Sequence, residues 1–329
     1  MPAPRDRLIG PMPSFDPAVG VVVKEPERAA PGYWAGCPSV WYEAGKRRFL
    51  MTYRERRPRG AESERGWRCA LAASRDGVHF EDLWEVRKED LKTPSMERCC
   101  VTPGPDGGYQ LFVSYVDPAD NRWRIDMLEA AEPGSLDIRA ARPVLTAEST
   151  GTEGVKDPYL VQVGPVSYLF ASFAAARPLS ASERELAHGN ADIYTTGVTT
   201  HPTGLATSDG GAGFLWHGTV FDTGTDGAWD RYQARLTCVL PTESGYLGCY
   251  DGSADPGENY EERCGLAVSA DLRHWERLTV DAPWITGPYG SESVRYFDAV
   301  AVNDQWWIYY EMARPDGAHE LRLHRTPIA

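Results

Sequence analysis

The chain repeats one pattern five times: a short apolar strand, a polar turn and an aromatic-rich strand. The paired runs cover residues 37–42 with 48–53, 98–102 with 109–115, 157–163 with 168–172, 235–240 with 246–250, and 296–302 with 306–310. They begin roughly sixty residues apart with one longer gap, a period typical of repeated units that cannot bury their apolar faces alone. Gly, Asp and Pro separate the runs, as in all-β chains. The pattern therefore predicts an all-β, five-bladed β-propeller.

We expect this propeller to form one domain over residues 1–329, with blades that begin near 37, 98, 157, 235 and 296. The N-terminal segment is expected to close the last blade. A large β-sandwich is the alternative, but a sandwich gives no reason for a fivefold recurrence. One helix is expected around residues 179–186, where Ser182 or Ser180 can cap the first turn.

A third strand in several units runs into a similar turn. The segments 74–80 and 269–275 each contain a Ser, an Asp two residues later and an aromatic at the end, and Ser208-Asp209-Gly210 occupies the same place in the third unit. Asp-Gly supplies the left-handed backbone that a tight turn requires. His79 and His274 belong to these turns, so we expect them to be structural.

Composition narrows the class of partner. The net charge of −13 argues against nucleic acid, since phosphate backbones need a basic face, although a local basic site can still hold an anionic small molecule. No run approaches the ~20 apolar residues of a membrane helix. The charged N-terminus is not followed by an apolar run, so we expect no signal peptide. The seven cysteines include no C-x-x-C pair. We therefore expect reduced thiols, a cytoplasmic location and no zinc site.

The segment 155–172, which contains Lys156-Asp157-Pro158, resembles the Asp-Pro blade opening of the five-bladed glycoside hydrolases and phosphorylases, a group that includes families 43, 32 and 130. The turns at 74–80 and 269–275 are similar to the Ser-x-Asp-(Leu/Gly)-x-x-(Trp/Phe) turns of those enzymes. The resemblance touches all five predicted blades. It implies the propeller fold, with chemistry in a central funnel.

The family 43 pattern implies three carboxylates in that funnel. An Asp opening the first blade is the general base, an Asp opening the third modulates the acid's pKa, and a Glu near the start of the fourth is the general acid. Asp157 matches the third-blade Asp. Cys37 stands where the base is expected, and Gln233 and Arg235 lie near the acid position with no Glu in register. These two departures count against an ordinary family 43 hydrolase.

The first residue of each inner strand is expected to face the axis. These positions are Cys37, Arg98, Asp157, Arg235 and either Arg295 or Tyr296, with Lys156 beside Asp157. Arginine forks suit carboxylate or phosphate, so the ring predicts a site for phosphate, a sugar phosphate or a uronate-like group. In the alternative, the arginines tie blades together by pairing with Asp157, Glu97, Glu153, Asp230 and Asp298. The sequence leaves both open.

The candidate acids are Asp157 by position, Asp298 near an inner-strand start, and Glu97, which can orient Arg98. The predicted substrate-binding set is Cys37, Arg98, Lys156, Gln233, Arg235, Arg295, Tyr296 and Trp34, the last as a sugar-stacking platform. No metal ligand or cofactor is expected, with an axial ion such as calcium left open.

These features favour an enzyme, glycosidase- or glycoside-phosphorylase-like, that acts on a glycoside or on a sugar-like molecule, neutral or anionic. Two alternatives remain: a sugar- or metabolite-binding propeller without hydrolytic activity, and a related scaffold used for tailoring or cyclisation in small-molecule biosynthesis.

Overall fold

The computed structural model describes residues 14–104, 106–210 and 213–328. Strands dominate it, as the sequence predicts. The α-helices in these ranges are α2 (Ala147–Thr150) and α3 (Ala181–His188), and the 3-10 helices are η1 (Pro17–Val19), η2 (Pro133–Ser135), η3 (Ile138–Ala140) and η4 (Ile193–Thr195). The expected helix is α3, and its N-cap is Ser180, whose side chain accepts from the backbone N–H of Glu183. No helix in the described ranges has the length and apolar character to cross a membrane.

Three sheets have four antiparallel strands each. The first contains β6 (Cys100–Pro103), β7 (Tyr109–Val116), β8 (Trp123–Ala130) and β9 (Arg142–Leu145). The second contains β10 (Val155–Val163), β11 (Val166–Phe173), β12 (Thr203–Ser208) and β13 (Leu215–Phe221). The third contains β14 (Gln233–Thr242), β15 (Gly245–Ser253), β16 (Arg263–Ser269) and β17 (Trp275–Arg277).

The remaining strands form an eight-stranded sheet that holds both ends of the chain. One half contains β2 (Trp34–Glu43), β3 (Arg48–Arg57), β4 (Arg65–Ser74) and β5 (Glu81–Arg87). The other contains β18 (Val294–Val302), β19 (Gln305–Ala313), β20 (His319–Pro327) and β1 (Val21–Lys24). A single parallel residue pair, Trp34 with His319, joins the halves, and β1 pairs with β20.

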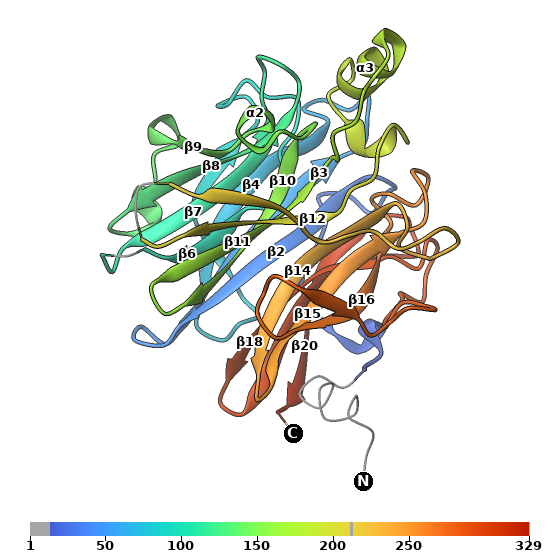
Figure 1. Cartoon of the computed structure of the whole chain (residues 1–329). Helices are drawn as coiled ribbons and strands as arrows, with labels where there is room; N and C mark the ends of the chain where they lie inside the picture. The colour runs from blue at the N-terminus through green and yellow to red at the C-terminus, as the bar shows by residue number, and fades with distance from the viewer. Residues whose placement is uncertain (1–13, 105, 211–212, 329) are drawn as a thin grey trace.

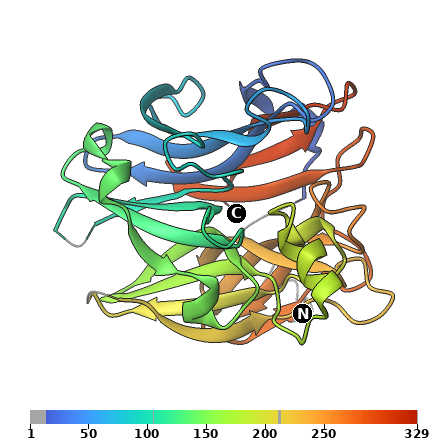
Figure 2. The same ribbon diagram turned by 90° about the horizontal axis from the view of Figure 1, so that it is seen from above.

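The sheets lie around a common centre when the molecule is seen from above (Figure 2). The strands β2, β6, β10, β14 and β18 begin within a few residues of the five predicted starts. The helix α3 stands at the end of the molecule opposite the end of β20 (Figure 1). β20 runs parallel to β2 and begins beside its start, at the Trp34–His319 pair. The starts of the inner strands therefore lie at the same end of the molecule as α3 and the long insertion between β11 and β12.

Bulges interrupt β2, β10 and β18 close to their starts. Cys37, Asp157 and Tyr296 lie in these bulges with φ of 53°, 59° and 52°. A positive φ is costly for residues with a Cβ and must be held by the surroundings. Acidic residues of adjoining strands hold two of these residues in place. The Cys37 N–H donates to Glu311 at 3.0 Å, and the Tyr296 N–H donates to Asp251 at 3.0 Å.

The repeated turns are structural, as expected for His79 and His274. Asp271 Oδ1 accepts the backbone N–H of His274 at 2.8 Å, and its other oxygen lies 2.7 Å from the imidazole. Asp76 and His79 make the same contacts. Gly77 supplies the left-handed residue in the first turn, with φ 72°, whereas Leu272 itself adopts φ 67° in the other.

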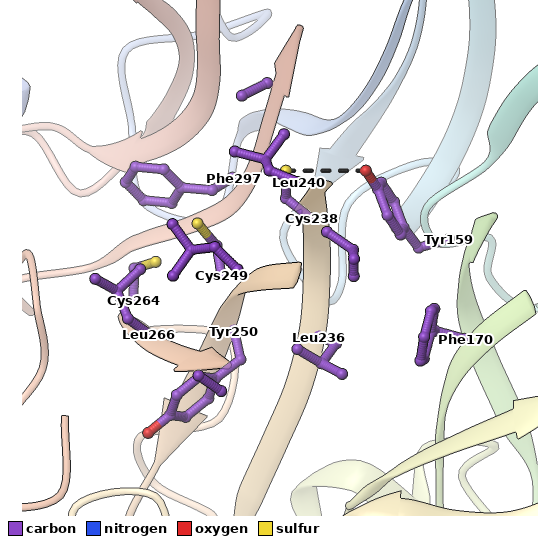
Figure 3. Packing of buried hydrophobic residues seen from close by; sticks show 14 of the residues in the cluster. Tyr159, Phe170, Leu236, Cys238, Leu240, Cys249, Tyr250, Cys264, Leu266 and Phe297 are labelled. Atoms are coloured by element: carbon purple, nitrogen blue, oxygen red, sulfur yellow. Dashed lines mark hydrogen bonds between the residues drawn. The ribbon is translucent and has the colours of Figure 1, made fainter. Parts of the chain in front are cut away.

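The apolar core lies between sheets. Its largest cluster joins β14, β15 and β16 to β10 and β11 on one side and to β18 on the other, through residues such as Leu236, Tyr250, Phe170 and Phe297 (Figure 3). Cys238, Cys249 and Cys264 belong to this cluster, and the Tyr159 hydroxyl lies 3.8 Å from the sulfur of Cys238. All seven cysteines are buried free thiols, in agreement with the sequence.

Candidate functional site

The predicted site residues are buried at the starts of the inner strands. Arg98, Asp157, Lys156, Arg235, Arg295, Gln233, Tyr296 and Cys37 are fully buried, and Asp298, Glu97 and Trp34 nearly so. Strand register shows which positions are equivalent: Arg235 lies opposite Asp251 on β15, and Arg295 opposite Glu311 on β19. Arg295 is therefore the counterpart of Arg235, and Tyr296 lies in the bulge that corresponds to Asp157.

Arg235 binds carboxylates from three strands or loops. Its guanidinium lies 2.8 Å from Asp157, 2.7 Å from Asp251 and 3.4 Å from Glu262, the residue before β16. Gln233 donates to Glu262 at 2.7 Å. Arg235 thus connects the sheet of β10 with that of β14, and its charge is matched inside the protein.

Arg295 is matched in the same way. It lies 2.6 Å from both Glu262 and Glu311. His319 bridges Glu311 at 2.7 Å and Glu261 at 3.0 Å, stacked on Trp34. Burial alone would lower the pKa of His319, but the hydrogen bonds to the two glutamates outweigh it and raise the pKa.

Arg98 donates to the carbonyl of Thr237 at 2.7 Å and lies 3.3 Å from Asp298. Its backbone N–H reaches Asp157 at 3.3 Å. The three arginines predicted to bind an anion are therefore all paired with protein acceptors. This geometry favours the alternative in which arginines tie sheets together. Asp157 and Asp298 are among the partners expected, whereas Glu153 pairs with His188 and Asp230 with Arg277.

The environments of the carboxyls move their pKa values in opposite directions. Burial raises the pKa of Asp298 to about 6, despite Arg98, and that of Asp251 to about 6, despite Arg235. For Asp157, burial acts upward, but the charges of Lys156, Arg235 and Arg98 outweigh it and lower the pKa. Asp157 is therefore a carboxylate at neutral pH. Asp298 is able to hold a proton close to neutrality.

Cys37 lies among charged groups without being ionised by them. Its thiol is 3.8 Å from Glu97 and 3.7 Å from Glu311. Burial raises the pKa of Cys37 well above its ordinary value, although Arg54 opposes the shift. Glu97 pairs with Arg54 of β3 rather than with Arg98.

A group of cations and aromatic rings, which the sequence analysis only partly identified, lies at the same end. We call it the cation–aromatic cluster: Trp34, Arg54, Arg56, Lys156 and Tyr260. The rings of Trp34 and Tyr260 are 6.1 Å apart, with Arg56 lying 4.1 Å from the first and 5.2 Å from the second. The Lys156 ammonium lies 5.4 Å from the Tyr260 ring and 4.0 Å from that of Tyr194.

Arg54, Arg56, Tyr194 and Tyr260 were not predicted. The strand alternation in Arg54-Glu55-Arg56 was an available signal, because residues two apart share one face of a strand. Tyr194 lies in η4 and Tyr260 in the loop between β15 and β16, and nothing in their local sequence indicates that they converge on the axis.

Loops cover the cluster and meet at one buried carboxylate. Asp192, in the insertion between β11 and β12, is fully buried and accepts the hydroxyl of Tyr260 at 2.6 Å. It also pairs with Arg59, and Arg65 lies 3.8 Å away. We call Asp192 with Arg59, Arg65 and Tyr260 the Asp192 latch. It joins loops from three separate sheets over the predicted funnel.

Clefts occur elsewhere on the molecule. One of about 820 Å³ is bordered by the turn after β10 and the start of β11, including Gln162 and Ser167, and by Gln110 and Glu129. It contains none of the predicted site residues. In the part of the chain that the structure describes, no group of three or more His, Cys, Asp or Glu side chains is placed to hold a metal ion.

Sequence comparisons identify no relative: neither the family models nor the curated proteins gave a match. Structural comparison does. A glycosyl hydrolase from Bacteroides ovatus aligns over 96% of this chain and 97% of its own, with 15% identity and a TM-score of 0.63. The β-1,2-mannobiose phosphorylase from Listeria innocua aligns over 92% of each chain, with 15% identity and a TM-score of 0.61.

A family 43 enzyme from Xanthomonas citri also aligns, over 92% of this chain and 90% of its own, with 13% identity and a TM-score of 0.60. The chain therefore has the fold of the propeller glycoside hydrolases and phosphorylases, and the resemblance seen in its sequence is confirmed at the level of fold. The likeness spans nearly the whole chain.

Proposed function

We propose that the chain is a carbohydrate-active enzyme, glycosidase- or phosphorylase-like, that binds a sugar-like small molecule at the centre of a five-bladed propeller. The sheet arrangement supports five blades, because the eight-stranded sheet divides at the single Trp34–His319 pair into two groups of four strands. With the three separate sheets, these make five units. Closure of the last unit by β1 accords with the expected role of the N-terminal segment.

The observation that carries the proposal is Asp157. It opens β10 at the position that the family resemblance gives to the third-blade Asp, and its bulge directs it into the central network. Its low pKa suits a charged carboxylate that modulates a neighbouring acid. Asp298, with its raised pKa, suits a proton donor. Glu97, paired with Arg54, completes the set of candidate catalytic carboxyls.

The test is turnover by the whole chain of β-1,2-mannobiose and a panel of other neutral and acidic disaccharides, with and without inorganic phosphate. Sugar release without phosphate indicates hydrolysis, and release of a sugar phosphate indicates phosphorolysis. We expect Asp157→Asn to reduce kcat by about a hundredfold or more, as for loss of a group in an acid–base pair. Asp137→Asn, an exposed control, leaves kcat unchanged. Full activity in a folded Asp157→Asn protein would contradict the proposed role.

A second candidate, a binding propeller without glycosidic turnover, is favoured by Cys37 and Gln233. Cys37 occupies the expected base position with a protonated thiol, and Gln233 lies near the acid position with its amide held by Glu262. Sugar binding without turnover would support this candidate. Turnover of a non-glycosidic substrate would support a tailoring or cyclisation role on the same scaffold.

We infer a cytoplasmic location, a small-molecule partner and no nucleic-acid or membrane partner. The buried free thiols and the net charge of −13 support these inferences.

A further inference from the structure

Lys156 has a buried charge without a hydrogen-bond acceptor. Its side chain is fully buried, and its ammonium makes no hydrogen bond within the described ranges. The nearest carboxylate oxygen, on Asp157, is 3.8 Å away and already binds Arg235 at 2.8 Å. The rings of Trp123, Tyr194 and Tyr260 attract the charge but offer no oxygen to its three donors. A buried ammonium in this state is costly.

Two arginines beside it also have free donors. Arg54 is fully buried, and its Nε and Nη2 have no hydrogen-bond partner in the resolved portion of the fold. Arg56 is half-buried, and no ion pair is formed by it with any described residue. Burial and the neighbouring Arg54 charge lower the pKa of Arg56 to about 10. Arg54 binds Glu97 through Nη1 alone. Among the described residues, Arg235, by comparison, has only its Nε without a partner, and Arg295 has no such donor, because their other nitrogens bind carboxylates.

We propose that Lys156, Arg54 and Arg56 bind an acidic group, carboxylate or phosphate, of the molecule that the site receives, with Trp34 and Tyr260 as its aromatic walls. This inference rests on the proposed function and names the chemistry of its ligand. It divides the cations into two sets. Arg98, Arg235 and Arg295 hold the sheets together, whereas the cation–aromatic cluster is the binding surface.

The two roles predict opposite effects on stability. An unpaired buried cation destabilises the free protein, so Lys156→Met should leave the melting temperature of the ligand-free protein unchanged or raise it. Arg235→Met should lower it, because Asp157, Asp251 and Glu262 lose their shared partner. If Lys156 only held sheets together, Lys156→Met would lower the melting temperature instead.

The experiment measures melting temperature and affinity with inorganic phosphate, D-glucuronate and glucose 6-phosphate, against D-glucose and sodium chloride of equal ionic strength. We expect at least one of the anions, but neither control, to stabilise the wild-type chain by mass action. Lys156→Met and Arg56→Gln should each weaken that affinity about tenfold or more, the effect of losing a charged hydrogen bond. Lys88→Met, in a lysine that donates to the carbonyl of Glu64, should keep it.

Stabilisation by phosphate alone would identify a free anion as the ligand, and stabilisation by the acidic sugars alone would place the acidic group on the sugar. Both support the proposal. It is overturned if no anion stabilises the wild type, if the two variants retain the affinity, or if Lys156→Met destabilises the free protein as Arg235→Met does. Arg56→Gln measures the affinity effect independently, without changing the buried charge of Lys156. If the protein binds anions but turns over no glycoside, the proposed function is rejected and this inference stands. If Lys156→Met turns over a glycoside at the wild-type rate, this inference is rejected and the proposed function stands.

Discussion

At the scale of single residues, the centre of the molecule is held by charge. Arg235 and Arg295 share Glu262, and Arg235 also binds Asp157 and Asp251. Such pairs add less stability than their distances suggest, because both charges lose water. Removing one member is different, since the carboxylates left behind stay buried without a counter-charge.

We therefore expect Arg235→Met to lower the free energy of unfolding by about 3–5 kcal/mol, as for other broken buried pairs. Urea titration monitored by tryptophan fluorescence measures this change. Arg139→Gln breaks an exposed pair with Asp137 and serves as the control, with no measurable change. A loss for Arg235→Met no larger than that of the control would show that water reaches these carboxylates.

Asp298 gives a prediction about pH. Its pKa is raised to about 6 in the fold, above its unfolded value, so its contribution to stability is complete below about pH 4 and is lost as the pH rises through 6. Asp298→Asn lacks this titration. Its stability relative to wild type should therefore increase between pH 4 and pH 7, on the order of 2 kcal/mol. Urea titrations at several pH values measure the difference, and a flat difference would contradict the raised pKa.

At the scale of elements, the insertion between β11 and β12 does more than connect two strands. It carries α3 and η4, and it places Asp192 where Tyr260 and the two arginines meet. The same insertion brings Tyr194 against Lys156. The insertion therefore contacts two members of the cation–aromatic cluster, Lys156 through Tyr194 and Tyr260 through Asp192.

We expect Asp192→Asn to loosen the latch, because the amide carries no charge for Arg59 and Arg65 and its NH₂ group opposes their donors. Amide hydrogen exchange should become faster in residues 174–202 and 254–262, with the protection of β14 and β15 unchanged. Glu183→Gln is the matched control: it weakens the cap of α3 within the same insertion and leaves 254–262 unaffected. Equal exchange of 254–262 in Asp192→Asn and wild type would show that other contacts hold the loops.

The elements were the most predictable part of the fold. Alternation of apolar runs with Gly- and Asp-rich turns located the inner strands, and the turn around Asp76 could be recognised again around Asp271. Leu272 shows the limit of such reasoning. The sequence analysis assigned the left-handed backbone of these turns to Asp-Gly, as at Gly77, and named no such residue for the turn at 269–275. There a buried Leu adopts the left-handed conformation, because packing outweighs backbone preference.

The site was less predictable, because its pairings join distant parts of the chain. The arginines at 235 and 295 could be expected to face the axis from their strand positions. Their partners Glu262 and Glu311 come from a loop and from a second strand, and no local pattern links them. The unpaired donors of Arg54 and Lys156 depend on which acceptors the fold brings near them, and no local sequence pattern shows that.

At the scale of the whole molecule, the first and last described strands, β1 and β20, lie in one sheet. β1 pairs with β20, and Tyr310 donates to the carbonyl of Pro17 at 2.6 Å. Phe15 stacks on His324 at 4.0 Å, and Arg322 donates to the carbonyls of Ala18 and Gly20. β1 thus covers an edge of β20 that would otherwise have unpaired backbone groups.

We expect deletion of residues 1–24 to lower the melting temperature and to promote self-association, since the edge of β20 is then free to pair with another chain. Phe15→Ala removes one stacked ring but keeps the strand, so it should lower the melting temperature less and leave the wild-type association state unchanged. Differential scanning calorimetry and light scattering measure both effects. A deletion variant with the stability and association state of Phe15→Ala would show that β1 is dispensable.

The pairing of β1 with β20 also bears on the order of events during synthesis. Tyr310 follows Pro17 by 293 residues, so at about 5–20 residues per second a ribosome needs roughly 15–60 seconds to produce the partner after the first strand has emerged. Until then β1 has nothing to join, while the intervening sheets are already able to form from neighbouring segments. β1 is thus synthesised long before the strand with which it pairs.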